Sequence, residues 1–167
     1  APHLRGLGTA KAAARTWEIP VCYERTFGLD VEHVAAASGL SPEAVVARHS
    51  GETYHVYMIG FTPGYPYMGD VPPPLVLPRR ENPRTQVPAG SVAIATVMTA
   101  VYTLQSPGGW HILGRTPVPL WSRARVDAPA LLAAGDKVRF VPVGVDEFRR
   151  IEERAAAGHF ELSPVAA

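Results

Sequence analysis

The chain has 167 residues with 47% hydrophobic content, which suits a single globular domain with an ordinary core. Its formal net charge of +1 gives the molecule no general attraction to nucleic acid or to an anionic membrane, and no apolar run approaches the ~20 residues that cross a bilayer. The single cysteine, Cys22, excludes an internal disulfide and a cysteine-based zinc site, and this cysteine usage fits a reducing, cytoplasmic setting.

The start of the chain is predicted to change from an irregular tail to a strand near residue 19. Residues 1–18 show no strand period and are expected to form a tail or a linker. After them Ile19, Val21 and Tyr23 alternate with other residues, which is typical of a strand, and Cys22 falls on the opposite face. The sequence gives Cys22 no neighbour that would stabilise a thiolate, so we interpret it as a packed small side chain.

Two short helices are predicted next. Asp30 can cap the first, over residues 31–38, and Ser41 can cap the second, over residues 42–50, with a glycine after each. The spacing also fits a DNA-binding helix-turn-helix, but its second helix offers only one arginine and one histidine for bases and phosphates. The favoured interpretation is a plain helical hairpin that covers one end of a β core.

The rest of the chain is predicted to be mainly β. Residues 54–59 are largely apolar on both faces, which indicates a central strand. Residues 91–105 can form two strands with a tight turn at Thr99 and Ala100. Many short strands joined by glycine and proline turns favour a β-barrel or a sandwich. The other expected elements are a tight turn over residues 106–110, a strand over 110–116, a helical turn over 128–134, a strand over 137–143, and a helix over 147–157 capped by Asp146.

The stretch from Gly60 to Gly90 is predicted to be an ordered binding loop. Its prolines and glycines prevent a regular helix or a central strand from running through it. A flexible linker would be poor in aromatic residues, whereas this stretch carries Phe61, Tyr65 and Tyr67. We expect these rings to line a pocket or an interface; the alternative is a structural loop whose rings pack on the core.

The charges between Tyr54 and Pro119 indicate an anion site. This span has only two acidic residues but four arginines, and a guanidinium group can bind a carboxylate or a phosphate through two hydrogen bonds. We therefore expect one site formed by Arg79, Arg80, Arg84 and Arg115, with neutral hydrogen bonds from Gln86, Gln105, Ser106 and the amides of Gly108 and Gly109.

His111 is the candidate general acid or base, because histidine titrates near neutral pH without special surroundings. The alternative is a histidine whose hydrogen bonds are satisfied in the barrel wall. The sequence contains no phosphate-binding G-x-x-x-x-G-K-[ST] loop, no dinucleotide G-x-G-x-x-G motif and no H-E-x-x-H motif. The six histidines show no metal-ligand spacing, so no metal is expected.

Four motifs in order along the chain resemble the allophanate hydrolase subunit 1 family. They are GFTPGYPYMG (residues 60–69), PRRENPRTQVPAGSV (78–92), SPGGWHILGRTP (106–117) and GDKVRFVP (135–142). The resemblance implies a mainly β fold, a cyclophilin-like closed β-barrel with a few short helices. It further implies a barrel domain over residues 19–143, a C-terminal helix and tail over 144–167, and residues 1–18 as the linker from a missing N-terminal domain.

The resemblance also implies a function. The family acts with a partner, subunit 2, in ATP-dependent 5-oxoprolinase or in a urea-carboxylase-like carboxyltransferase. The chain is then expected to be a hydrolase subunit that acts on a small carboxylate or amide, with ATP bound at the level of the complex. The alternative within the family is a non-catalytic protein that binds and inhibits a sensor histidine kinase.

Overall fold

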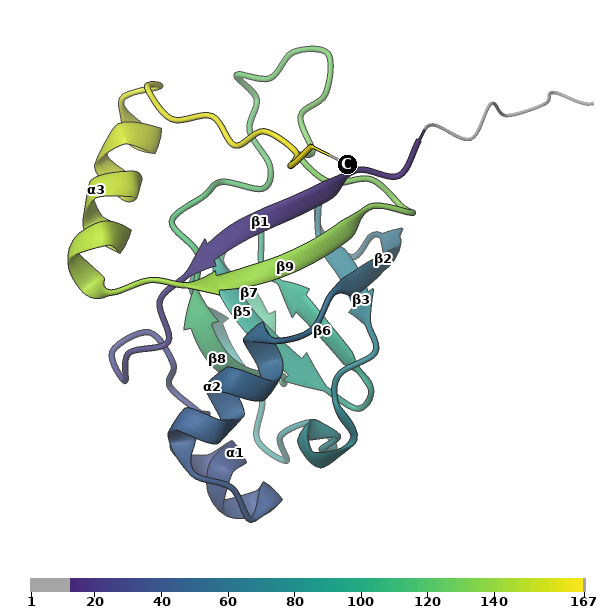
Figure 1. Ribbon diagram of the computed structural model, residues 1–167, viewed down its shortest axis with the longest axis vertical. Helices are drawn as coiled ribbons and strands as arrows, with labels where there is room; N and C mark the ends of the chain where they lie inside the picture. The colour runs from purple at the N-terminus through teal and green to yellow at the C-terminus, as the bar shows by residue number, and fades with distance from the viewer. Residues whose placement is uncertain (1–12, 167) are drawn as a thin grey trace, which may run out of the picture.

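A computed structural model describes residues 13–166 as a mainly β fold (Figure 1). Seven strands form one sheet in the order β1-β9-β2-β3-β6-β5-β8, and β4 and β7 form a separate two-stranded ribbon. The strands are β1 (Thr16–Val21), β2 (Tyr54–Ile59), β3 (Pro66–Gly69), β4 (Arg84–Val87), β5 (Ser91–Ala95), β6 (Met98–Val101), β7 (Ser106–Gly108), β8 (His111–Arg115) and β9 (Lys137–Pro142). The helices are α1 (Val31–Ser38), α2 (Pro42–Ser50) and α3 (Val145–Ala156), with a short 3-10 helix at Pro73–Leu75.

The seven-stranded sheet curls until its two edges meet. Directly after β1, the backbone N–H of Cys22 donates to the carbonyl of Arg115 in β8 at 2.9 Å, and the N–H of Arg115 donates back at 3.0 Å. This pair of hydrogen bonds joins the first and last strands of the sheet, which leaves no long free edge there. The expected mainly β, barrel-like fold with a few short helices is therefore confirmed.

The barrel begins earlier than the sequence pattern predicts. β1 starts at Thr16 and pairs in parallel with β9 over its whole length, from Thr16 beside Lys137 to Val21 beside Pro142. Trp17 is buried in this strand, so a linker that ends at residue 18 would cut through the barrel wall. Only the first three residues of this strand were missed, because Thr16 and Glu18 give no clear apolar alternation and the strand's stability comes from a partner distant in the sequence.

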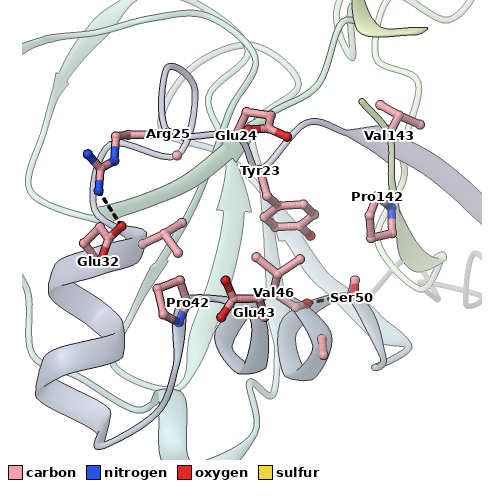
Figure 2. Close-up of a pocket in the computed structure, with 13 residues that line it drawn as sticks. Tyr23, Glu24, Arg25, Glu32, Pro42, Glu43, Val46, Ser50, Pro142 and Val143 are labelled. Atoms are coloured by element: carbon pink, nitrogen blue, oxygen red, sulfur yellow. Dashed lines mark hydrogen bonds and ion pairs between the residues drawn. The ribbon is translucent and has the colours of Figure 1, made fainter. Parts of the chain in front are cut away.

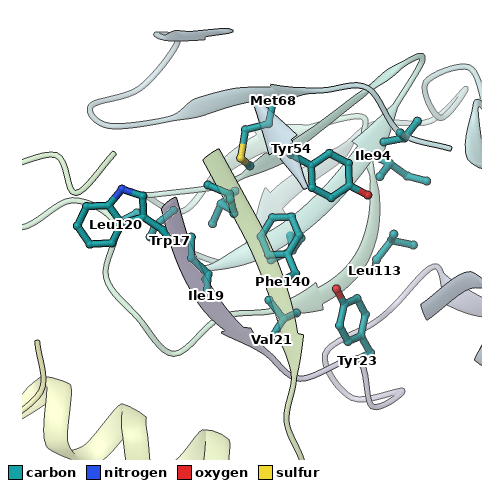
Figure 3. Close-up of a cluster of buried hydrophobic side chains, with 14 of the residues drawn as sticks. Trp17, Ile19, Val21, Tyr23, Tyr54, Met68, Ile94, Leu113, Leu120 and Phe140 are labelled. Atoms are coloured by element: carbon teal, nitrogen blue, oxygen red, sulfur yellow. The ribbon is translucent and has the colours of Figure 1, made fainter. Parts of the chain in front are cut away.

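Large side chains from β1, β2, β8 and β9 fill the barrel (Figure 3). The core includes Ile19, Tyr54, Leu113 and Phe140, all essentially without exposed surface. Each such side chain contributes about 1.5–3 kcal/mol relative to an exposed one. β2 lies between β9 and β3 as a central strand, but only one of its faces is buried, because His55 and Tyr57 point outward.

The helical hairpin of α1 and α2 covers one end of the barrel, and α3 lies against its side (Figure 1). The Ser41 hydroxyl accepts from the Ala44 N–H at 3.1 Å, which confirms the predicted cap of α2. Two predicted caps are wrong: the carboxylate of Asp30 turns away from α1, and Asp146 lies in the first turn of α3, which begins after Gly144. None of the helices within residues 13–166 is long and apolar enough to cross a membrane.

Three local predictions differ from the structure. The turn between β5 and β6 lies at Thr96 and Val97, because Thr99 is buried in β6 and its hydroxyl donates to the carbonyl of Ala93. Residues 106–108 form β7 rather than only a turn, since they pair with β4. Residues 128–134 are not helical: the N–H of Leu131 donates to the carbonyl of Leu120, which holds this segment in an irregular course over the core.

Candidate functional site

The loop over residues 60–90 and the β4–β7 ribbon enclose a cavity of about 430 Å³, here called the aromatic pocket. Six residues from the predicted site set line it, together with four residues that were not predicted. The predicted six are Phe61, Tyr65, Tyr67, Arg79, Gly108 and Gly109, and the other four are Pro83, Tyr102, Pro107 and Trp110. The sequence thus identified the segments that form this pocket but missed the aromatic rings of Tyr102 and Trp110.

Tyr65 is the centre of the ring cluster. Its ring centroid lies 5.3 Å from Phe61, 4.9 Å from Tyr67, 5.3 Å from Tyr102 and 6.4 Å from Trp110, with interplanar angles between 54° and 89°. Such tilted and edge-to-face contacts are favourable and leave little freedom to the rings. Burial, reinforced by the neighbouring tyrosines, raises the pKa of Tyr65, so its hydroxyl stays neutral in the physiological range.

Phe61 lies at the outer edge of this cluster in a strained conformation. Its φ is 68°, a left-handed value that bulky residues rarely adopt, and its side chain is 66% exposed. The edge contact with Tyr65 therefore places an apolar ring at the rim of the pocket, in contact with solvent. An exposed aromatic ring in this position can close over a bound ligand or contact a partner protein.

Gly108 makes room for the pocket wall. A Cβ atom at this position would lie 2.1 Å from the hydroxyl oxygen of Tyr102, far inside van der Waals contact. Arg84 in β4 pairs with Gly108 in β7, so the glycine backbone is also fixed by the ribbon. Tyr102 can keep its place against the ribbon only because residue 108 has no side chain.

The structure does not bring the four predicted arginines into one site, although Arg79 and Arg80 line one cavity together and Arg80 and Arg84 share one carboxylate. Arg79 alone lines the aromatic pocket, and within residues 13–166 it forms no ion pair. Arg80 and Arg84 both bind the buried carboxylate of Asp30, with their closest contacts at 2.7 Å. Burial would raise the pKa of Asp30, but hydrogen bonds from Arg84 and the Ile112 amide, with both arginine charges, hold it below its usual value.

Arg115 lies in a different part of the barrel. Its guanidinium carbon is 5.2 Å from the ring centroid of Phe27, and the residue lines a cavity of about 210 Å³ with Phe148 and Glu152 of α3. Burial lowers the pKa of Arg115, opposed in part by the charge of Glu152. Arg115 therefore belongs to the contact between barrel and α3 and is not part of the aromatic pocket.

His111 is buried in the barrel wall beside the aromatic pocket. Its Nε2 donates to the carbonyl of Pro78 at 2.8 Å, and its ring stacks on His33 with centroids 5.3 Å apart. It lines a neighbouring cavity of about 490 Å³, which shares Arg79 with the aromatic pocket. The alternative, a histidine whose hydrogen bonds are satisfied in the barrel wall, therefore holds for Nε2. Nδ1 has no hydrogen-bond partner among the described residues.

The remaining predicted residues do not line the aromatic pocket. Gln86 in β4 and Gln105 before β7 are both exposed. Ser106 is the first residue of β7, and its hydroxyl is buried without a partner among the described residues. Tyr102 and Trp110, which were missed, flank the segment that contains Gly108. Because both residues lie close in the sequence to that glycine-rich segment, their positions could have indicated that they line the pocket.

Another cavity, of about 680 Å³, lies between the helical hairpin and the ends of β1 and β9 (Figure 2). Its charged lining is mainly acidic, with Glu24, Glu32 and Glu43 against Arg25, which pairs with Glu32 at 2.7 Å. The acidic excess disfavours binding of an anion in this cavity. Within residues 13–166, no three metal-ligating side chains come together.

The sequence that builds this fold and pocket matches a known protein family. Residues 5–132 match the family described as "Carboxyltransferase domain, subdomain C and D". The chain belongs to this family. The match includes every residue of the aromatic pocket, whereas β9 and α3 lie beyond it.

Curated relatives of this carboxyltransferase-domain chain are components of two kinds of enzyme. It is 44% identical to the B-type subunit of 5-oxoprolinase from Bacillus subtilis over 84% of this chain and 58% of the relative. It is 50% identical to the corresponding 5-oxoprolinase subunit of Escherichia coli over 77% of this chain and 59% of the relative. It is 34% identical to a urea amidolyase of Lachancea kluyveri over 48% of this chain and 5% of the relative. The chain thus spans under two thirds of the length of the 5-oxoprolinase subunits it matches.

Two solved structures share the fold of this chain. A conserved uncharacterized protein of Pyrococcus horikoshii is 46% identical, with a TM-score of 0.76 over 80% of this chain and 62% of that one. Urea amidolyase of K. lactis has a TM-score of 0.81 over 92% of this chain and 11% of that one. Its identity of 21% means that this second likeness shows the fold alone.

Proposed function

We propose that this chain is part of the B-type subunit of an ATP-dependent 5-oxoprolinase, and that the aromatic pocket binds the 5-oxoproline. The observation that carries the proposal is Arg79, a cation without an ion-pair partner among the described residues, beside a cluster of aromatic rings. 5-Oxoproline is a small ring with one carboxylate. Its carboxylate matches a guanidinium group, and its ring matches flat apolar walls.

The chemistry of the pocket lining supports an acceptor-rich ligand. Arg79 donates hydrogen bonds, Trp110 carries an indole N–H, and neutral tyrosine hydroxyls can donate as well. Among the described residues no acidic side chain lines the pocket, so a carboxylate meets no like charge there. A hydroxyl or indole N–H that donates to the lactam carbonyl would withdraw electrons from its carbon, which assists attack during ring opening.

ATP is assigned to another part of the complex in this proposal. The sequence has no phosphate-binding loop, and Asp30 binds the side chains of two of the three arginines near the pocket. One free arginine suits a carboxylate better than a triphosphate. A urea-carboxylase-like carboxyltransferase is the related alternative, supported by the resemblance to urea amidolyase.

The proposed subunit also requires a protein partner, and one surface supports this. Tyr57 and Met58, neighbours in β2, are each more than half exposed, and Phe61, three residues further along the chain, is exposed at the rim of the aromatic pocket. Exposed apolar side chains that lie together are typical of interaction surfaces. The same surface supports the second candidate function, a non-catalytic protein that binds a sensor histidine kinase.

The test is 5-oxoproline-dependent ATP turnover by the full-length protein with its partner subunits. Arg79→Ala should lower kcat/KM for 5-oxoproline by about 10- to 100-fold, the range for a lost charged hydrogen bond. Arg48→Ala, which removes an exposed arginine on α2, is the control and should leave turnover unchanged. Equal activity of the two variants would reject the role of Arg79, and absence of 5-oxoproline-dependent turnover in the assembled wild type would reject the substrate.

A further inference from the structure

Asp30 is a buried carboxylate that joins three segments of the chain. It immediately precedes α1, and its side chain has only 4% of its surface exposed. Arg84 donates to both carboxylate oxygens, at 2.7 and 2.9 Å, and Arg80 donates to Oδ1 at 2.7 Å. The backbone N–H of Ile112 in β8 donates to Oδ2 at 2.7 Å. One carboxylate therefore holds together the start of α1, the 60–90 loop with its strand β4, and β8.

Hydrogen bonds to their backbone groups hold the residues on both sides of Arg79 in the chain. Before it, the carbonyl of Pro78 accepts from Nε2 of His111 at 2.8 Å. After it, the N–H of Arg80 donates to the carbonyl of Gly109 at 2.8 Å. His111 begins β8, and Gly109 belongs to the wall of the aromatic pocket. The backbone of Arg79 is thus fixed between two anchored neighbours, and Asp30 binds the side chain of one of them.

We propose that Asp30 is a positioning residue for the aromatic pocket. By binding Arg80 and Arg84, it fixes the loop that holds Arg79 against the ligand. This inference rests on the proposed function. Asp30 itself does not line the pocket and does not touch the ligand. Its role is to keep two arginines away from the ligand and to fix the backbone that presents the third.

Electrostatics explains why the carboxylate is needed. The side chains of Arg80 and Arg84 are only 27% and 23% exposed, so their charges are poorly screened by water. Without the carboxylate these two cations would repel one another and the adjacent Arg79. Removing one partner of a buried ion pair leaves the other charge uncompensated, and the flanking loop would then move toward solvent. Arg79 would lose its fixed position in consequence.

A matched control exists on another part of the barrel. Asp136 precedes β9 and is also almost fully buried. Its carboxylate accepts from Arg15, from the indole N–H of Trp17 and from the backbone N–H of Ala133. Asp30→Asn and Asp136→Asn thus remove the same charge from two similar environments, of which only the first lies next to the aromatic pocket.

The experiment compares the two variants in the full-length protein by two measurements. The first is native-state hydrogen exchange of the Arg80 amide, which needs no ligand. Asp30→Asn should lower its protection about tenfold or more, since a misplaced loop breaks the hydrogen bond to Gly109. The second is the affinity for 5-oxoproline by calorimetry, which should fall about tenfold or more in Asp30→Asn. Asp136→Asn should leave both within about twofold of the wild type at temperatures where it is folded.

The outcomes separate the two proposals. Unchanged Arg80 protection in Asp30→Asn, or an equal loss in both variants, overturns the positioning role. Loss of protection in Asp30→Asn alone, without any binding of 5-oxoproline to the wild type, supports the anchoring of the loop and rejects the proposed ligand. Should Asp30→Asn not fold, Arg84→Lys keeps the charge but loses the two-armed contact, and the same two measurements should fall by a smaller factor.

Discussion

The hydroxyl of Tyr23 lies 2.8 Å from Nδ1 of His49 inside the barrel. The other ring nitrogen of His49 lies 2.9 Å from the hydroxyl of Thr99, which itself donates to the carbonyl of Ala93. Because a hydroxyl donates only one proton, Thr99 accepts from Nε2, and Nδ1 is left to accept from Tyr23. The chain of hydrogen bonds thus requires a neutral imidazole in the core.

The first prediction concerns the pH dependence of stability. Burial lowers the pKa of His49 from 6.5 to about 3, so the unfolded chain takes up a proton that the folded chain excludes as pH falls below 6.5. The free energy of unfolding should therefore decrease by about 2 kcal/mol between pH 7.5 and pH 5 through this residue. Denaturant unfolding across this range measures it.

The control for His49 is another histidine. His49→Gln should flatten the pH dependence, whereas His159→Gln, on the exposed segment after α3, should not. The buried carboxylates Asp30 and Asp136 have lowered pKa values, so the stability they provide is lost only as pH falls below about 3.8, outside the measured range. If the free energy of unfolding changes equally with pH in the wild type and in both variants, His49 is not the titrating group.

The second prediction concerns the two adjacent glycines of the pocket wall. Gly108→Ala should reduce the free energy of unfolding by about 1–3 kcal/mol, because the added methyl group collides with Tyr102. Gly109→Ala should be tolerated, since its Cβ would lie 3.5 Å from the ring of Pro83, an ordinary contact. Chemical denaturation of both variants checks this difference, and similar stabilities would contradict the packing described for Tyr102.

The third prediction concerns the exposed apolar run on β2. Replacing Tyr57 and Met58 together with serine should weaken binding of the partner subunits about tenfold or more, with little loss of fold stability because both side chains are largely exposed. Val126→Ser changes an apolar residue that is 85% exposed on another loop, and should leave binding intact. Co-purification and a titration of the full-length protein with its partners distinguish these outcomes.

The fourth prediction concerns Arg115. Arg115→Met should leave the affinity for 5-oxoproline within about twofold, because the guanidinium group packs on Phe27 instead of the aromatic pocket. It should alter thermal stability through the contact with α3. Calorimetric titration of 5-oxoproline into Arg115→Met and into Arg79→Ala tests this prediction. A comparable loss of affinity in both variants would mean that the two arginines share one anion site.

The elements that were predicted well from the sequence have local causes. The alternation of residues 137–143 and the proline and glycine that bracket residues 42–50 act within a few positions, and both elements form where expected. The aromatic pocket was partly predictable for a similar reason: Phe61, Tyr65 and Tyr67 lie close together in a stretch with little regular structure.

The failures come from contacts between distant residues. Asp30 lies outside the span from Tyr54 to Pro119 whose charges predicted the anion site, yet it binds Arg80 and Arg84 from 50 and 54 positions away. Arg115 was grouped with them by sequence span, although it lies against a different helix. Pairing of β4 with β7 likewise depends on partners that local periodicity does not reveal.

The parallel pairing of β1 with β9 also constrains synthesis of the protein. A nascent chain that has emerged from the ribosome only as far as α2 or β6 holds β1 without its neighbour, because that neighbour is Lys137–Pro142. During that interval Trp17, Ile19 and Val21 have no completed interior to enter. Ribosome-bound intermediates should therefore stay open to proteases until residue 142 has emerged from the ribosome, and then become resistant in a single late step.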